Sequence, residues 1–318
     1  MRPYGLQQLI GSISEQTQVE TKHPIELIIL DNDCHGSASG VLKHMQLSER
    51  FRLHYEVEPV RGIAYARNRC VRLALAMGAN VIAFLDDDET TDREWLSTIL
   101  ACMEEYDAPV VFGLVKPFFD CAPPRWVQEG NYFIQQDQIT GEPHQHISTG
   151  NVIIRREVFD AIGMFDKRWG LQGGSDLEFF TRVSRAGFRL IGCNEAITHH
   201  RVSLRRATRL WLLQRAFRWG NETAAIAILH DSRFRRRAIL IEEGVRTALE
   251  FVIPIIGSLF RLNLSNFFQR LRMIAKGAGL ICGALGYRYE EYRYFAGSED
   301  VTGSTNELIV QLPQDPVH

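Results

Sequence analysis

The chain has 318 residues, of which 45% are hydrophobic and 23% are charged, and its formal net charge is -2. This length is enough for one large α/β domain with an appendage, whose core needs no disulfide bonds, and the small net charge argues against a nucleic-acid partner. The six cysteines include no C-x-x-C pair, which indicates a reducing compartment. No apolar run follows a basic start, so we expect no signal peptide and a cytoplasmic location.

Apolar, β-rich runs alternate with helical stretches over the first 115 residues. Because the runs end at turn residues and the stretches between them repeat every 3.6 residues, they predict strands and helices in turn. Such βα units predict an open, doubly wound, mostly parallel sheet that binds its ligand beyond the carboxyl ends of the strands. The predicted strands cover Ile25–Leu30, Leu53–Val57, Asn80–Leu85 and Val110–Val115, and the predicted helices cover Tyr4–Gln16, Ser37–Leu47, Ile63–Met77 and Asp92–Glu105.

An irregular segment, Phe118–Ser148, is punctuated by proline and glycine and is predicted to be a loop over the site. From about Leu204 the pattern is helical. We therefore expect a first domain over 1-203, a helical, arginine-rich region over 204-295 and a flexible tail over 296-318. Within the later part of the first domain we predict a strand at Val152–Ile154, a helix at Asp176–Ala186 and a strand at Arg189–Cys193.

The helical region is strongly basic. Ten arginines between Arg201 and Arg237 are opposed by Glu222 and Asp231, a local excess of eight positive charges, with aromatic residues interleaved. Such a block favours phosphate groups, so it either holds a lipid diphosphate or lies on an anionic membrane, and a solvated helix face is the alternative. The later apolar stretches are too short or too interrupted to span a bilayer, but they favour peripheral contact with the inner face of the cell membrane.

Three aspartates, Asp86, Asp87 and Asp88, follow the apolar run Val81–Leu85, at the carboxyl edge of a predicted strand. Adjacent carboxylates repel one another and favour a bound cation, and Asp86 and Asp88 can face the same way. Oxygen ligands suit Mg²⁺ or Mn²⁺, which in turn bind a diphosphate. The alternative is a solvated acidic turn that caps the helix predicted to begin near Asp92.

Six segments follow one another along the chain in a characteristic order. They are ILDND (Ile29–Asp33), GIAYARN (Gly62–Asn68), VIAFLDDDE (Val81–Glu89), TGNVIIRREVFDAIGMFD (Thr149–Asp166), GGSDLEFFTRVSRAG (Gly173–Gly187) and EAITHHRV (Glu195–Val202). With these segments in this order, the chain resembles family 2 of the GT-A glycosyltransferases over about residues 1-220. Within that family it is similar to the glucosyltransferases of succinoglycan-type exopolysaccharide synthesis. The resemblance implies a GT-A fold, which is Rossmann-like α/β, here with a C-terminal helical extension.

The resemblance also implies roles at the donor site. Asp31 would hold the uracil, and an acceptor-only carboxylate suits the N–H of the base. Asp86 would contact the ribose, Asp88 would hold the metal, and Asp87 would be the variable middle residue. Arg67 would lie near the donor. The alternatives are a turn-forming aspartate for Asp31 and a structural ion pair for Arg67.

For the transfer step the resemblance implies Asp176 as the base that deprotonates the acceptor. The family usually has Glu-Asp here, whereas this chain has Ser175-Asp176, and we read Ser175 as a helix cap in a capping box with Glu178. An aspartate favoured by the helix dipole is the alternative. A family histidine falls on His200, which we prefer over His199 as a metal or diphosphate ligand, with a structural role as the alternative.

The family begins with a short apolar strand, which this chain lacks before its first helix, so we expect the first strand to be missing and its neighbour to lose a partner. The implied function is inverting transfer of a sugar, with glucose expected, from a UDP-sugar to a polysaccharide or lipid-linked oligosaccharide, with Mg²⁺ or Mn²⁺. One alternative is a non-catalytic, membrane-associated binding or scaffold protein with a degenerate glycosyltransferase fold. The second is a nucleotidyltransferase, which would need a glycine-rich, lysine-bearing phosphate loop that the sequence does not contain.

Overall fold

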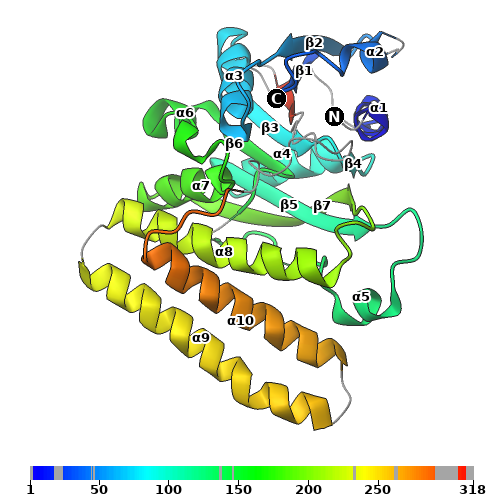
Figure 1. The fold of residues 1–318 in the computed structure, drawn as a ribbon. Coiled ribbons are helices and arrows are strands. Elements are labelled where there is room, and N and C mark those ends of the chain that lie inside the picture. The colour runs from blue at the N-terminus through cyan, green and yellow to red at the C-terminus, as the bar shows by residue number, and fades with distance from the viewer. Residues whose placement is uncertain are drawn as a thin grey trace. The chain divides into compact units, whose positions relative to one another are not determined.

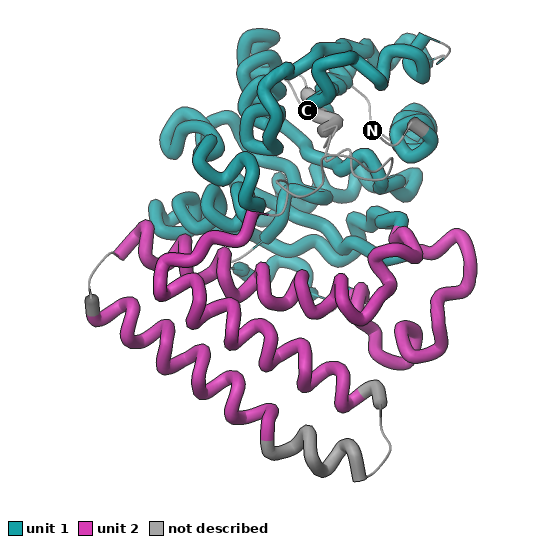
Figure 2. The backbone as a smooth tube through the Cα atoms, viewed as in Figure 1, with its two compact units in different colours: residues 1–117, 135–201, 291–318 teal, residues 118–134, 202–290 magenta. Residues whose placement is uncertain are grey.

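The computed structural model describes residues 3-17, 24-43, 45, 47-135, 138-144, 147-231, 234-260, 264-290 and 307-312. The chain divides into two compact units, drawn in teal and magenta in Figure 2. Unit 1 comprises residues 1-117, 135-201 and 291-318, and unit 2 comprises residues 118-134 and 202-290. The division near residue 202 lies close to our expected domain boundary, but unit 2 also takes in part of the predicted loop.

The described strands of unit 1 form one eight-stranded sheet with the order β2-β1-β8-β3-β6-β5-β7-β4 (Figure 1). β1 and β2 are parallel, whereas β8 and β6 run antiparallel to both of their neighbours. Therefore β1, β2, β3 and β5 share one direction, which confirms the α/β class, although the sheet is mixed. The strands are β1 (Ile25–Asp31), β2 (Phe51–Val57), β3 (Val81–Asp86), β4 (Glu89–Thr91), β5 (Val110–Phe118), β6 (Val152–Arg155), β7 (Leu190–Arg201) and β8 (Glu307–Leu312).

The position between β1 and β3 is filled by β8, which comes from the C-terminal region that we expected to be a flexible tail. Val310 is fully buried there, in register with Leu27 on one side and with Ala83 on the other. The described N-terminal residues contain no strand before β1, but β1 does not lose a neighbour as we expected. The physical reason is that β8 pairs its backbone N–H and C=O groups with both flanking strands, whose groups would otherwise be buried unpaired.

Both faces of this sheet are covered by helices. Leu27 and Leu85 belong to a buried cluster with α1 and α4, whereas Ile28 and Phe84 belong to a second cluster with α3, α6 and α7. Because successive strand residues point to opposite faces, strands covered on both sides read as continuous apolar runs. The helices are α1 (Pro3–Ser14), α2 (Ser39–Leu42), α3 (Ile63–Ala76), α4 (Trp95–Glu105), α6 (Arg156–Ile162) and α7 (Ser175–Arg185), with the 3₁₀ turn η1 (Lys167–Trp169).

Unit 2 is helical and consists of α5 (Arg125–Gly130), α8 (Arg209–His230), α9 (Phe234–Phe260) and α10 (Leu264–Ala284). Glycines allow α8 and α10 to approach closely: a Cβ atom on Gly279 would lie 2.0 Å from the Phe217 carbonyl oxygen, and one on Gly220 would lie 2.0 Å from that of Lys276. This contact gives the glycines of α10 a packing role. Among the helices that the structure describes, none is both long enough and apolar enough to cross a membrane.

Candidate functional site

Asp86, Asp87 and Asp88, here called the acidic turn, lie at the same edge of the sheet in unit 1 as Asp31. Leu30 of β1 and Asp86 of β3 are both in register with Glu307 of β8, which lies between them. Two strand spacings separate their backbones by about 10 Å. Asp31 follows Leu30 as the last residue of β1, so both predicted donor residues lie where the strand pattern places them, at carboxyl ends of strands that run the same way.

Asp31 is fully buried, and both of its carboxylate oxygens accept hydrogen bonds from the protein. Oδ1 accepts from the backbone N–H of Asp33 at 3.0 Å, and Oδ2 accepts from that of Ala38 at 2.7 Å and from the Tyr55 hydroxyl at 3.0 Å. Burial and the hydrogen bond to Asp31 raise the pKa of Tyr55, which stays a neutral donor. Three of about four acceptor sites on the carboxylate are thus filled.

Asn32, which sequence reasoning missed, connects the loops around this edge. Its side-chain amide donates to the carbonyls of Glu58 and Val60 at 2.9 and 2.8 Å, and its Oδ1 accepts from the N–H of Gly62 at 2.8 Å. These bonds join the loop after β1 to the start of α3, the helix that carries Arg67. The only sequence signal was the position of Asn32 beside Asp31, so its role depends on tertiary contacts.

The acidic turn contains a fourth carboxyl group that the sequence interpretation also missed. Asp87 and Asp88 are each only 6% exposed, and Glu89, which begins β4, is 3% exposed. Burial raises the pKa of Glu89 well above its usual value, and the negative charges of Asp86 and Asp87 raise it further. Gly150 lies beside this group, since a Cβ atom there would be 2.8 Å from Glu89 Oε1 and 3.5 Å from Asp86 Oδ2. This crowding of acidic groups favours a cation.

The structure distinguishes the two candidate histidines. β4 pairs with β7 so that Glu89 is in register with His200, and His200 Nδ1 lies 3.2 Å from Asp88 Oδ1. His199 instead contacts Asp92, with 2.9 Å between Nε2 and Oδ1. A carboxylate and an imidazole are both accepted ligands of Mn²⁺, and the carboxylates suit Mg²⁺, so the residues present fit a divalent metal.

Among the residues that the structure describes, Asp88 and His200 belong to no group of three or more neighbouring ligand atoms. In the described residues, three ligand atoms within 4.8 Å of one another occur at Asp33, Cys34 and His35, on the loop after β1, where Cys34 and His35 are exposed. The side chain of Asp33 accepts from the His35 backbone N–H, as expected of a local turn. A metal held by Asp88 and His200 would therefore take further ligands from elsewhere, and diphosphate oxygens are suitable.

Asp176 lies in the first turn of α7 and is half-buried, and its Oδ1 accepts from the backbone N–H of Leu177 at 2.9 Å. The predicted capping box is wrong. Gly174, with φ of +75°, is the N-cap, and Ser175 lies inside the helix, where its hydroxyl accepts from Arg67 Nη1 at 2.8 Å. Glu178 binds Arg182, with 2.8 Å between Oε1 and Nε. Arg67 is buried and joins α3 to the start of α7.

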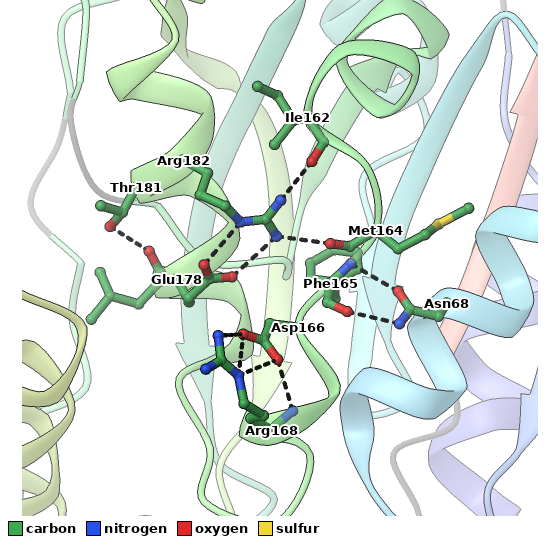
Figure 3. Close-up of polar contacts among 10 residues, drawn as sticks. Asn68, Ile162, Met164, Phe165, Asp166, Arg168, Glu178, Thr181 and Arg182 are labelled. Carbon is green, nitrogen blue, oxygen red and sulfur yellow. Dashed lines mark hydrogen bonds and ion pairs between the residues drawn. The ribbon is translucent and has the colours of Figure 1, made fainter. Parts of the chain in front are cut away.

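A polar network holds the segment that leads into α7 (Figure 3). Arg182 binds both carboxylate oxygens of Glu178 and donates to the carbonyls of Ile162, the last residue of α6, and Met164 at 2.7 and 2.8 Å. Asn68 of α3 exchanges two hydrogen bonds of 2.8 Å with the backbone of Phe165. Because these contacts fix the chain on both sides of the glycine turn, they hold the first turn of α7 and its Asp176 in a defined place.

An α/β sheet covered on both faces, with acidic residues at the carboxyl end of a strand and a histidine beside them, is typical of the GT-A fold. The family profile described as Glycosyl transferase family 2 matches residues 3-163, about half of the chain. The chain belongs to glycosyl transferase family 2, as the resemblance indicated. This membership favours a glycosyltransferase over a nucleotidyltransferase.

Relatives match over most of the chain. It is 31% identical over 285 residues to the succinoglycan biosynthesis protein ExoM of Rhizobium meliloti (strain 1021), covering 88% of each chain. It is 25% identical over 228 residues to a glucosyl-dolichyl phosphate glucuronosyltransferase of Haloferax volcanii, covering 68% of this chain and 72% of the relative. A crystal structure of S. aureus TarS 1-349 in complex with UDP aligns over 90% of this chain and 89% of that chain, with 14% identity and a TM-score of 0.47.

Proposed function

We propose that the chain is an inverting, metal-dependent glycosyltransferase that moves glucose from a UDP-sugar to a polysaccharide or lipid-linked oligosaccharide. The observation that supports this best is the 3.2 Å contact between Asp88 and His200, which brings two metal-ligand types together at the carboxyl edge of the sheet. The names of two relatives support a saccharide acceptor, since one refers to succinoglycan biosynthesis and the other to a glucosyl-dolichyl phosphate.

At the donor, Asp88 and His200 would hold Mg²⁺ or Mn²⁺, which would supply charge stabilisation to the diphosphate when bound. Asp86 contacts the ribose, and Asp87 is the variable residue between them. Asp31 offers its remaining acceptor site to the uracil N–H, while its other bonds hold the loop on which the base would lie. Fewer free acceptor sites on that carboxylate make the fit to one N–H group more selective.

At the acceptor, Asp176 takes the proton of the attacking hydroxyl group. The acceptor oxygen then forms a bond to C1 of the sugar on the side opposite the diphosphate, the bond from C1 to the diphosphate oxygen breaks, and its electron pair leaves with UDP. Arg67 supports this geometry near the donor, because its bond to Ser175 holds the start of α7 against α3. We also place the chain in the cytoplasm, in peripheral contact with the inner face of the membrane through its basic helices.

The two adjacent histidines provide a matched test. UDP binding, measured by calorimetry with and without Mn²⁺, should depend on the metal and weaken at least about tenfold in Asp88→Asn and in His200→Gln. The control His199→Gln should bind UDP like the parent protein, since His199 contacts Asp92. Equal losses in the two histidine variants would reject the proposed ligand.

A second test separates binding from transfer. Asp176→Asn should bind UDP with Mn²⁺ normally but should not transfer sugar, because an amide cannot accept the acceptor proton. Normal turnover in this variant would reject the proposed base. If the parent protein binds a saccharide partner without turning over any UDP-sugar, the non-catalytic scaffold is the better description.

A further inference from the structure

Unit 2 carries a cluster of cations that the donor site does not use. Arg206, Arg215 and Arg218 lie on α8 or just before it, and Arg272 lies on α10; these four residues form the arginine cluster. The guanidinium carbons of Arg206 and Arg215 lie 5.9 and 5.3 Å from the centre of the Trp211 ring. That of Arg272 lies 5.0 Å from the centre of the Tyr132 ring.

The rings that support these cations are packed into one aromatic cluster. Trp126, Tyr132 and Phe268 have ring centres 5.4 to 5.5 Å apart, and Phe133 stacks on Trp211 at 6.0 Å. Stacking on a ring occupies the face of a guanidinium but leaves its N–H groups, which lie in the plane, free to bind an acceptor. The packing thus orients the arginines before any ligand arrives.

A hydrogen-bonded glutamine also fixes one of the cations. Gln269 of α10 donates to the carbonyl of Gly130 at 2.6 Å, and its Oε1 accepts from Arg272 Nη1 at 3.0 Å. These bonds join α10 to the end of α5 through the side chain that holds Arg272. A bound anion would therefore meet a guanidinium whose orientation is already set, which reduces the entropy lost on binding.

Two members of the arginine cluster lie away from carboxylates. Glu222 lies 3.5 Å from Arg218 Nε, but in the described part of the chain no carboxylate is within ion-pair distance of Arg215 or Arg272. Burial, and then the charges of Arg218, Arg206 and Arg272, lower the pKa of Arg215 to about 10. Arg215 as a whole is nevertheless an exposed residue of α8.

We propose that the arginine cluster is a binding site for an anion of the phosphate or diphosphate ester class. The planar forks of arginine match phosphate oxygens in pairs, and an anion would remove the mutual repulsion of the cations. The anion comes either from a lipid headgroup or from a molecule in solution. The use of the arginine cluster by a lipid-linked acceptor rests on the proposed function, whereas the binding of an anion to the cluster does not.

The experiment uses the full chain in EDTA, so that metal-dependent binding at the acidic turn is absent. Inorganic pyrophosphate is titrated by calorimetry, and sedimentation with vesicles compares phosphatidylcholine alone with phosphatidylcholine containing phosphatidylglycerol. The variants Arg215→Gln and Arg272→Gln should each weaken binding at least about tenfold. Arg235→Gln, an exposed arginine on α9, makes the same charge change and should alter binding less than about twofold.

Two results support the site and identify its source of anion. Pyrophosphate binding that is lost in Arg215→Gln supports a site for soluble phosphates. Binding only to the anionic vesicles, lost in the same variant, supports a headgroup site. The proposal is overturned if neither probe binds, or if Arg235→Gln has the same effect as Arg215→Gln.

Two further variants keep the result interpretable. Arg215→Lys retains the charge but not the fork, so it should still weaken binding severalfold even if Arg215→Gln fails to fold, and circular dichroism checks the helices of each variant. Asp88→Asn should bind pyrophosphate in EDTA like the parent protein. This distinguishes failure of the donor site from failure of the arginine cluster, since only the former depends on the acidic turn.

Discussion

The strand β8 offers the sharpest test of the fold, because a single side chain in it occupies the middle of the sheet. Val310 is fully buried between β1 and β3, in the cluster that includes α1 and α4. The substitution Val310→Ala keeps every backbone hydrogen bond of β8 and removes only two buried carbon atoms. Any loss of stability therefore reports on how well this strand is packed into unit 1.

The expected cost follows from burial. Two carbon groups at about 0.8 kcal/mol each amount to about 1.6 kcal/mol of lost transfer free energy. The cavity that remains between two strands and two helices adds to this, so we expect a total of about 2 to 3 kcal/mol. A control is Val60→Ala, since Val60 is 47% exposed in the same unit, and its cost should be about 0.5 kcal/mol or less.

Hydrogen exchange measures this cost within one unit, which suits a chain of two units better than a single unfolding midpoint. In Val310→Ala, the slowest amides of β1 and β3 should exchange about thirtyfold faster, as about 2 kcal/mol predicts. The amides of α8 in unit 2 serve as the internal reference and should not change. If β1 and β3 exchange equally in Val310→Ala and Val60→Ala, the reasoning about β8 is wrong.

Two further predictions concern single polar side chains. Asn151 accepts from Trp95 Nε1 at 2.7 Å, is fully buried and has a φ of +56°. Because Asn151→Ala loses hydrogen bonds and places alanine in a strained conformation, it should lower the free energy of unfolding in urea by about 3 kcal/mol. Unchanged stability would contradict this. Burial would raise the pKa of Asp166, but hydrogen bonds from Arg168 outweigh burial and lower that pKa. The ionised carboxylate therefore stabilises the fold above about pH 4, which is the pKa of an unfolded aspartate. This stabilisation disappears as the pH falls through the lower pKa of Asp166 in the folded state. Asp166→Asn should therefore lower the free energy of unfolding in urea by up to about 1 kcal/mol at pH 7 and by less near pH 3, and a loss independent of pH would refute the ion pair.

The sequence by itself determined the elements whose burial is periodic. Strands β1 and β3 and helix α3 lie within a residue or two of the predicted ranges, because both faces of the sheet are covered and the apolar runs are long. For the same reason the apolar run Val81–Leu85 was sufficient to place the acidic turn at the carboxyl edge of the sheet. The order of the motifs along the sequence also identified the family, since the spacing of residues within each motif is retained where overall identity is low.

Contacts between distant segments were decided only by the tertiary structure. The contact of Asp88 with His200 depends on the pairing of β4 with β7, and a three-residue strand such as β4 carries too little pattern to be predicted. Ser175 fits a capping motif locally, but its hydroxyl accepts a hydrogen bond from the buried Arg67 of another helix instead. Within the predicted flexible tail, Glu307–Leu312 forms β8 because its backbone pairs with two strands that would otherwise have unpaired groups. A sequence pattern records which side chains favour burial, whereas pairing depends on which edge is open, and only the folded sheet supplies that edge.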